Sequence, residues 1–148
     1  MIIYFYLISF SLIGYGLIVS KFLRINISDF GNLGILGITF LSIISYSTSL
    51  FLSHGIFFNS FILFLGIFLF FIFIKEINNL KKEIILLFSI FSLLIIFILV
   101  AKNHDDFSYY HFPYSIFLTE FSHPIGFGNL NNGFRSPSSI FFINSMFY

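Results

Sequence analysis

Long apolar runs alternate along the chain with short polar stretches, and this pattern predicts helices that cross a membrane. A bilayer core about 30 Å thick takes roughly 20 apolar residues as a helix. Residues 1–20 carry no charge and are followed by Lys21 and Arg24, so we expect the first span there. Residues 31–74 contain no Asp, Glu, Lys or Arg. One helix of that length would run about 66 Å, twice the hydrocarbon thickness, so the chain must turn back within it.

The turn is expected in residues 53–60, SHGIFFNS, which hold the only His, Gly and Asn near the middle of that run. The other elements follow from the same pattern of polarity. We predict spans at residues 1–20, 31–53, 57–74 and 84–101, with a polar loop at residues 75–83. The fold class is therefore all-α, a polytopic transmembrane helical bundle over residues 1–101.

Residues 102–137 form a polar and aromatic loop, and residues 138–148 are apolar again. The last stretch is too short to cross a bilayer. We expect it to begin a fifth span, so that this chain is the N-terminal piece of a longer protein and is inactive alone. The alternative is a naturally short protein whose end dips into the membrane.

A short helix is expected inside the loop, because Pro113 suits a first helical turn that runs on to about Phe121. The aromatic side chains around it suit the headgroup layer of a membrane. They are Tyr109, Tyr110, Phe112, Tyr114 and Phe117. We therefore expect the helix to lie flat at the interface, with Ile116, Phe117 and Phe121 in the lipid.

Basic residues predict the orientation, because those of short loops favour the cytoplasm. The loops after the first and third spans hold five: Lys21, Arg24, Lys75, Lys81 and Lys82. Residues 102–137 hold only Lys102 and Arg135. We therefore expect the N-terminus and the loop 102–137 outside the cytoplasm.

Composition agrees with a lipid environment. Of 148 residues, 58% are apolar and 9% are charged, whereas a soluble domain uses roughly 25% charged residues. The partner that this composition indicates is membrane lipid. A net charge of +1 gives no argument for a nucleic-acid partner. The absence of cysteine excludes disulfides, a thiolate nucleophile and cysteine-based metal sites.

Asp105 and Asp106 are the candidate catalytic residues. Neighbours on a helix point about 100° apart, so the two carboxylates cannot share one proton, and we expect only one to act. A carboxylate there can take a proton from an acceptor hydroxyl or hold a divalent cation. The alternative is that either residue caps a short helix. A metal site of Asp106 with His104, His111 and His123 would match no standard zinc spacing. His54 receives no role.

Residues 123–139 add glycines, asparagines and Arg135 to the loop. Glycine lets backbone approach a ligand closely, and an arginine can hold a phosphate by paired hydrogen bonds. The alternative is a plain surface loop with Arg135 as an interfacial anchor. The Gly-x-Gly at residues 126–128 lacks the third glycine and the context of a dinucleotide site.

The order of these features resembles the GT-C superfamily of polytopic membrane glycosyltransferases, and more closely an uncharacterised bacterial group of GT-C-like integral membrane proteins. The resemblance covers about residues 105–142. It rests on Asp106, Tyr110-His111-Phe112-Pro113, Gly126-Phe127-Gly128-Asn129-Leu130 and Ser138-Ser139. The relatives place His and then Arg soon after Asn-Leu, whereas this chain has Asn131 and Gly133 there.

The resemblance implies sugar transfer from a polyprenyl-phosphate-linked donor on the outer face of the bacterial inner membrane. Asp106 would be the general base, with Asp105 as the other candidate, and Arg135 or a divalent cation would steady the leaving phosphate. The substrate-binding residues would be Tyr110, His111, Asn129 and Arg135.

Two other classes stay open. A transporter or flippase fragment predicts charged residues inside the spans, and the four predicted spans contain none. A non-catalytic membrane scaffold predicts that the loop tolerates Asp→Asn changes.

Overall fold

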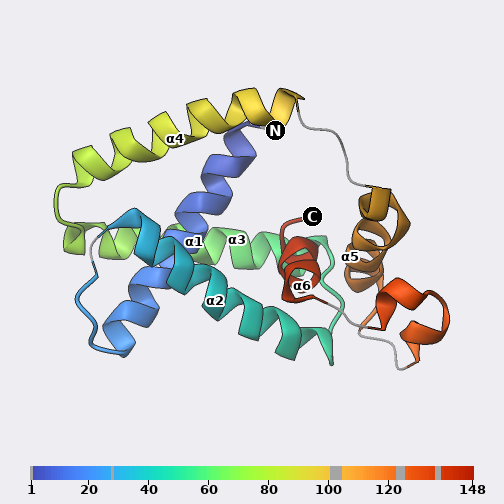
Figure 1. Ribbon diagram of the computed structural model, residues 1–148. Helices are drawn as coiled ribbons and strands as arrows, with labels where there is room; N and C mark the ends of the chain where they lie inside the picture. Colours follow the sequence, from blue (N-terminus) through green and yellow to red (C-terminus); the bar gives the residue numbers. More distant parts are fainter. Residues whose placement is uncertain (1, 28, 101–104, 123–125, 136–137) are drawn as a thin grey trace.

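The computed structural model describes residues 2–27, 29–100, 105–122, 126–135 and 138–148. Over these residues the chain is helical and contains no strand, so the predicted all-α class is confirmed. Four long helices come first along the chain (Figure 1). They are α1 (Ile2–Phe22), α2 (Phe30–Ser49), α3 (Ile56–Phe73) and α4 (Leu80–Val100).

The helices α1, α2 and α3 are long and apolar enough to cross a membrane. They occupy the three stretches for which the first three spans were predicted. The helix α2 ends at Ser49, earlier than the predicted residue 53, and a turn without helix precedes α3. These helices make the chain a membrane protein, because so many apolar side chains on their outer faces need hydrocarbon around them.

The helix α4 begins at Leu80, so the polar loop predicted at residues 75–83 is shorter than expected. Lys81, Lys82 and Glu83 lie in its first turn, where an acidic side chain interacts favourably with the helix dipole. The Oε2 atom of Glu83 also accepts a hydrogen bond from the backbone N–H of Phe30, the first residue of α2. The two atoms are 3.0 Å apart. A fourth crossing of the membrane by residues 84–101 stays a prediction.

Glycines bring the first three helices into close contact. A Cβ atom on Gly14 of α1 would overlap the carbonyl oxygen of Gly66 in α3. A Cβ atom on Gly16 or Gly37 would overlap a backbone carbonyl across the contact between α1 and α2. Lipid tails are as apolar as leucine, so helices in a bilayer associate through close packing at small residues. Any larger side chain at these positions would push the spans apart.

Two contacts place the loops after α1 and α3 at the same end of the bundle. Lys21 Nζ lies 2.7 Å from Glu76 Oε1, and the same ammonium group lies 4.5 Å from the ring centre of Phe73. The end of α1, the end of α3 and the segments that follow them carry five of the basic residues and are therefore neighbours, as the orientation argument requires. That this end faces the cytoplasm stays a prediction.

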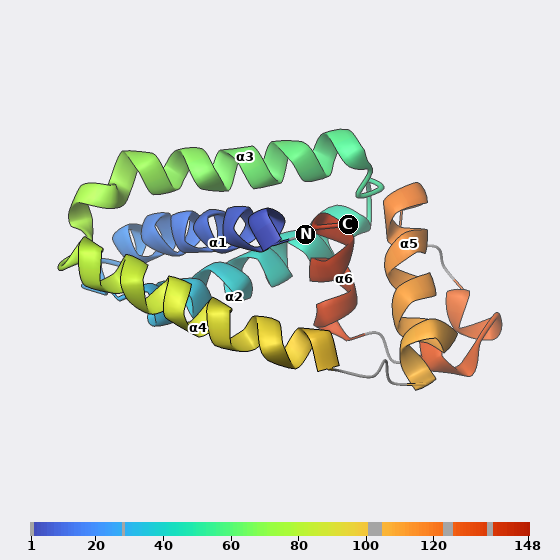
Figure 2. The same ribbon diagram turned by 90° about the horizontal axis from the view of Figure 1, so that it is seen from above.

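The remaining segments gather at the opposite end. A π-helical turn (Phe107–His111) leads into α5 (Phe112–Glu120), and two 3-10 turns (Phe127–Asn129 and Asn132–Phe134) precede α6 (Ser139–Met146). Figure 2 shows α5 and α6 running crosswise to α1 and α3. The Tyr4 hydroxyl of α1 donates to the carbonyl of Phe147 at 2.8 Å, which brings the N-terminal end of α1 beside the end of α6. A fifth span beginning in residues 138–148 stays a prediction.

A compact aromatic cluster holds this end together. Its buried members are Tyr114, Leu118, Phe127, Phe134, Phe141 and Phe142. The rings of Phe127 and Phe134 stack with their centres 4.6 Å apart, and Tyr114 packs edge-on against both. Burial raises the pKa of Tyr114 to about 12, with the nearby Tyr46 as a second cause, so the phenol stays neutral.

This cluster shows that part of the prediction for the short helix was wrong, namely that all its aromatic side chains face the membrane interface. Tyr114 is 1% exposed and does not face the headgroup layer. Phe117 is half-buried and packs against Phe127, with ring centres 4.7 Å apart. Phe121 is exposed, and its contact with lipid stays a prediction. The reason is that residues 126–134 fold back over α5 and cover the face that the sequence pattern left open.

Candidate functional site

The two candidate carboxylates lie where the chain enters the π-helical turn. Asp105 is exposed and Asp106 is half-buried. The hydroxyl of Tyr110, four residues further on, donates to Oδ2 of Asp106 at 3.5 Å, a long hydrogen bond. The two acids therefore have different surroundings, and Asp106 is the one turned toward the other candidate residues.

Pro113 lies in the first turn of α5, just after the π-helical turn, in which the backbone N–H of Phe112 reaches five residues back to the carbonyl of Phe107. A proline lacks the N–H that would bond the carbonyl four residues earlier, which here belongs to Tyr109. The side-chain amide of Asn131 donates to the Tyr109 carbonyl at 3.4 Å. A distant loop residue thus satisfies the acceptor that the proline leaves open.

Tyr110 joins the helix to the loop. Its ring lies edge-on to that of His111, with centres 4.4 Å apart, and His111 also packs on Phe141 at 5.0 Å. On another side, a Cβ atom on Gly133 would come within 2.8 Å of Tyr110 Cβ and Cδ1, so only glycine fits without a shift. The Gly133 N–H is held by Oδ1 of Asn131 at 2.9 Å. Residues 131–133 therefore rest directly on the tyrosine ring.

Asn129 and Arg135 lie together on the two 3-10 turns, and both are exposed. The Nε atom of Arg135 donates to the carbonyl of Gly128 at 3.3 Å. The Asn129 backbone N–H donates to the carbonyl of Gly126, whose φ of 87° is a conformation that favours glycine. The predicted residues thus form two groups: Asp106, Tyr110 and His111 on the helix, and Asn129 and Arg135 on the turns. The Gly133 contact connects them.

The metal site considered from the sequence cannot be traced through all its members, because His104 and His123 lie outside the described residues. Among the residues that the structure describes, no three His, Asp or Glu side chains gather in a way that could hold a metal ion. A divalent cation near Asp106 stays a prediction.

Sequence reasoning missed the role of a buried histidine. His54 lies in the turn between α2 and α3 and is 0% exposed. Its backbone N–H donates to the carbonyl of Leu118 in α5 at 2.7 Å. Its ring nitrogens lie 2.6 Å from Oγ of Ser145 in α6 and 3.0 Å from Oγ1 of Thr48 in α2. One residue therefore ties the bundle to both crosswise helices.

The ring of His54 is neutral near pH 7, because burial lowers its pKa to about 4. The Ser145 hydroxyl donates to the carbonyl of Phe142 at 2.7 Å, which leaves its oxygen to accept from Nδ1 of His54. Asn59, at the start of α3, donates to the carbonyl of Ser145 at 2.8 Å and strengthens the same junction. The only signal for this in the sequence was a histidine amid hydroxyl and amide residues in a turn between two apolar runs.

The fold and the candidate site define an all-helical membrane protein with a folded polar and aromatic segment at one end of its bundle. Over residues 1–148 the chain matches the family model described as Domain of unknown function (DUF8201), and it belongs to this family. No curated protein and no solved structure matches the chain.

Proposed function

We propose that the chain carries the catalytic segment of a GT-C-like glycosyltransferase. The enzyme would move a sugar from a polyprenyl-phosphate-linked donor to an acceptor hydroxyl, on the extracytoplasmic face of the bacterial inner membrane. Asp106 is the general base, and Asp105 is the second candidate. The proposal rests on the residue pattern from Asp106 to Ser139 and on the placement of that segment beside membrane-capable helices.

One observation carries the proposal: Asp106, Tyr110 and His111 share one helical stretch at the end of the bundle. This stretch lies at the end where α1 begins, through the Tyr4 contact with the end of α6. A general base must come within hydrogen-bond reach of the proton it takes. A half-buried carboxylate at the end of membrane-capable helices can meet both a lipid-linked donor and a water-borne acceptor.

Arg135 and Asn129 would bind the phosphate of the lipid-linked donor. Arg135 is exposed and offers a planar set of N–H donors that fits a phosphate. Asn129 lies on the adjoining turn, next to Gly126. Tyr110 and His111 would contact the sugar. A divalent cation is the alternative to Arg135 in assisting departure of the phosphate.

The alternative is a non-catalytic membrane scaffold, and the aromatic packing favours it. Tyr110 and His111 both pack on Phe141, so their rings also serve as structural contacts. In a scaffold, removing a carboxylate would change stability at most.

The test compares Asp106→Asn with Asp105→Asn. The asparagine at position 106 keeps the size of the side chain and still accepts a hydrogen bond from Tyr110, but it cannot take a proton. Transfer of labelled sugar from a polyprenyl-phosphate donor is measured in membranes and normalised to folded protein. We expect Asp106→Asn to lose about a hundredfold or more in rate, as is usual for a general base.

Asp105→Asn is the matched control, because the same change occurs one residue away on an exposed side chain. It should keep most of the activity. Near-wild-type transfer in both variants would refute the assigned base and leave the scaffold as the better account.

A further inference from the structure

Basic side chains gather at the end of the bundle where α1 and α3 end and α2 and α4 begin. All of them are exposed, and they are Lys21, Arg24, Lys75, Lys81 and Lys82. Asp29, Glu76 and Glu83 lie at the same end. Five positive charges stand against three negative ones, so this end carries a formal net charge of +2.

The three acidic side chains at this end are bound by the protein itself. Glu76 pairs with Lys21 at 2.7 Å, and Glu83 accepts the first backbone N–H of α2. Asp29 accepts hydrogen bonds from the backbone N–H and the side-chain amide of Asn32, at 2.9 and 3.0 Å. Within the part of the chain that the structure describes, the other four basic side chains form no ion pair. Their charge is therefore open to an anion from outside the protein.

Two of these four side chains line an open groove at the start of α4. Lys81 and Lys82 share this groove with Asn79 and Ile85, and its volume is about 360 Å³. Residues three and four positions apart are neighbours on a helix surface, so both lysines lie on the side of α4 that carries Ile85. Ile85 is 56% exposed. The groove therefore places two ammonium groups directly beside exposed aliphatic carbon.

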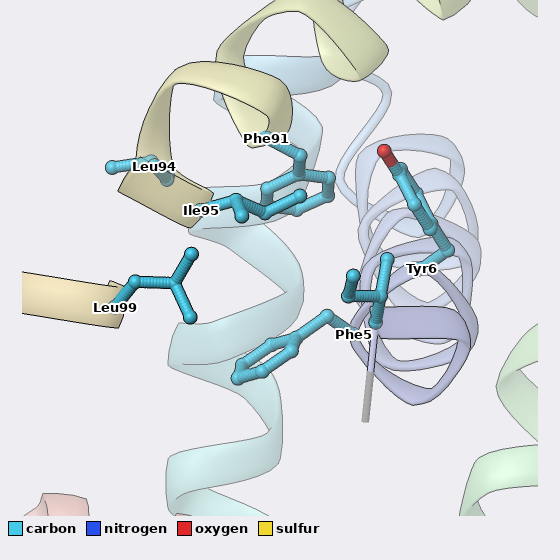
Figure 3. Close-up of a pocket in the computed structure, with 7 residues that line it drawn as sticks. Phe5, Tyr6, Phe91, Leu94, Ile95 and Leu99 are labelled. Carbon is cyan, nitrogen blue, oxygen red and sulfur yellow. The ribbon is translucent and has the colours of Figure 1, made fainter. Parts of the chain in front are cut away.

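The surroundings of the groove are those of a membrane surface. The helices α1 and α3 are long and apolar enough to cross a membrane, and their ends define the level at which headgroups lie. Further along α4, its second half and the start of α1 line an apolar groove that Phe5 and Tyr6 face (Figure 3). That groove contains no charged residue and does not distinguish one hydrocarbon chain from another. A charged headgroup beside α4 is therefore bound at Lys81 and Lys82.

We propose that the groove of Asn79, Lys81, Lys82 and Ile85 binds the headgroup of an anionic phospholipid. The two ammonium groups bind the phosphate, and Ile85 contacts the carbon atoms where the acyl chains begin. A free phosphate would leave Ile85 uncovered, so the groove fits a lipid better than a soluble anion. The inference does not depend on the proposed function, because this groove and Asp106 lie at opposite ends of the bundle.

The experiment measures lipid binding to the purified protein in neutral detergent by native mass spectrometry. The probes are phosphatidylglycerol and phosphatidylcholine with identical acyl chains. We expect phosphatidylglycerol to bind at least about tenfold more tightly, because each basic residue beside an anionic headgroup strengthens binding about fivefold. Lys81→Gln combined with Lys82→Gln should lower its affinity about thirtyfold. Equal binding of the two lipids by the wild type would overturn the inference.

Arg24→Gln combined with Lys75→Gln is the matched control, because it removes two charges from the same end but outside the groove. It should cost less than about fivefold, since these charges add only long-range attraction, which salt screens. All four side chains are exposed, so neither double variant should shift the thermal unfolding midpoint. Equal losses of affinity in the two double variants would mean a diffuse attraction to the whole surface and would refute the groove as the site.

Two further measurements separate a lipid from other anions. Ile85→Ser should weaken binding of phosphatidylglycerol about threefold or more, because apolar burial is lost while the charge is unchanged. Glycerol phosphate, which has the phosphate without the acyl chains, should not displace the lipid, and neither should a short poly-glutamate peptide. Displacement by glycerol phosphate would identify a soluble phosphate ester as the ligand, and displacement by the peptide would identify an acidic protein segment. Either result would overturn the assignment to a lipid.

Discussion

Replacing His54 by alanine should detach the candidate-site segment from the bundle. The change removes two side-chain hydrogen bonds, those to Ser145 and Thr48, each contributing about 1 kcal/mol net. It also empties a site that is 0% exposed, where the imidazole stacks on Phe58 with ring centres 5.1 Å apart. The cavity that the missing ring leaves lowers the free energy of unfolding by about another 2 kcal/mol, a value at the low end for large-to-small changes in a core. The expected loss is about 4 kcal/mol.

Two measurements check this value. Thermal unfolding in detergent should shift down by about 10 °C, since a chain of this size loses roughly 2–4 °C per kcal/mol. Limited proteolysis should cut residues 105–148 sooner than the helices α1 to α3, because the lost bonds are those that dock α5 and α6. His54→Gln is the matched variant. It keeps hydrogen-bonding groups at the position and should lose less than half as much stability.

The pH dependence gives an independent check on the same residue. The pKa of His54 is lowered by burial from 6.5 to about 4. Between these values the unfolded chain binds a proton that the folded chain does not, so stability falls as the pH drops from 6.5 toward 4. His54→Gln should lack this part of the decline. An alanine variant with the wild-type midpoint and equal protection of residues 105–148 would refute the role assigned to His54.

The remaining predictions concern packing and orientation. Gly66→Ala should destabilise the protein by about 1–3 kcal/mol through overpacking against α1, whereas Gly34→Ala, where a Cβ meets nothing within 4 Å, should be neutral in the same unfolding assay. Equal effects of the two changes would contradict the close helix contact. A cysteine at Ser108 should react with a membrane-impermeant thiol reagent in intact cells, and a cysteine at Asn79 should not. Both positions are exposed, so the reverse labelling pattern would invert the proposed orientation.

The helices themselves could be predicted from the sequence. In hydrocarbon every backbone polar group must be bonded within its own segment, so a long run without charge can only be helix. The turn inside residues 31–74 followed from length alone. The start of α4 was predicted too late, because charged residues such as Lys81 and Lys82 can lie in a first helical turn as well as in a loop.

Only those contacts of the candidate site that join residues close in sequence could be predicted. Asp106 and Tyr110 meet because residues four apart share one side of a helix. The Gly133 contact with Tyr110 depends on how the loop folds back. The periodicity of either segment does not encode that contact.

Burial at the end of the bundle was decided by tertiary structure alone. An isolated helix from Pro113 to Phe121 would expose Tyr114, and the packing of distant aromatic rings on it makes the ring a core residue. These rings belong to Phe127, Phe134, Phe141 and Phe142. His54 and Ser145 are 91 positions apart, and neither has a neighbour in sequence that explains their bond. Local patterns fix which segments become helices, because each helix satisfies its own backbone. Which polar groups end up buried together depends on how those helices dock, and that is set by contacts between distant parts of the chain.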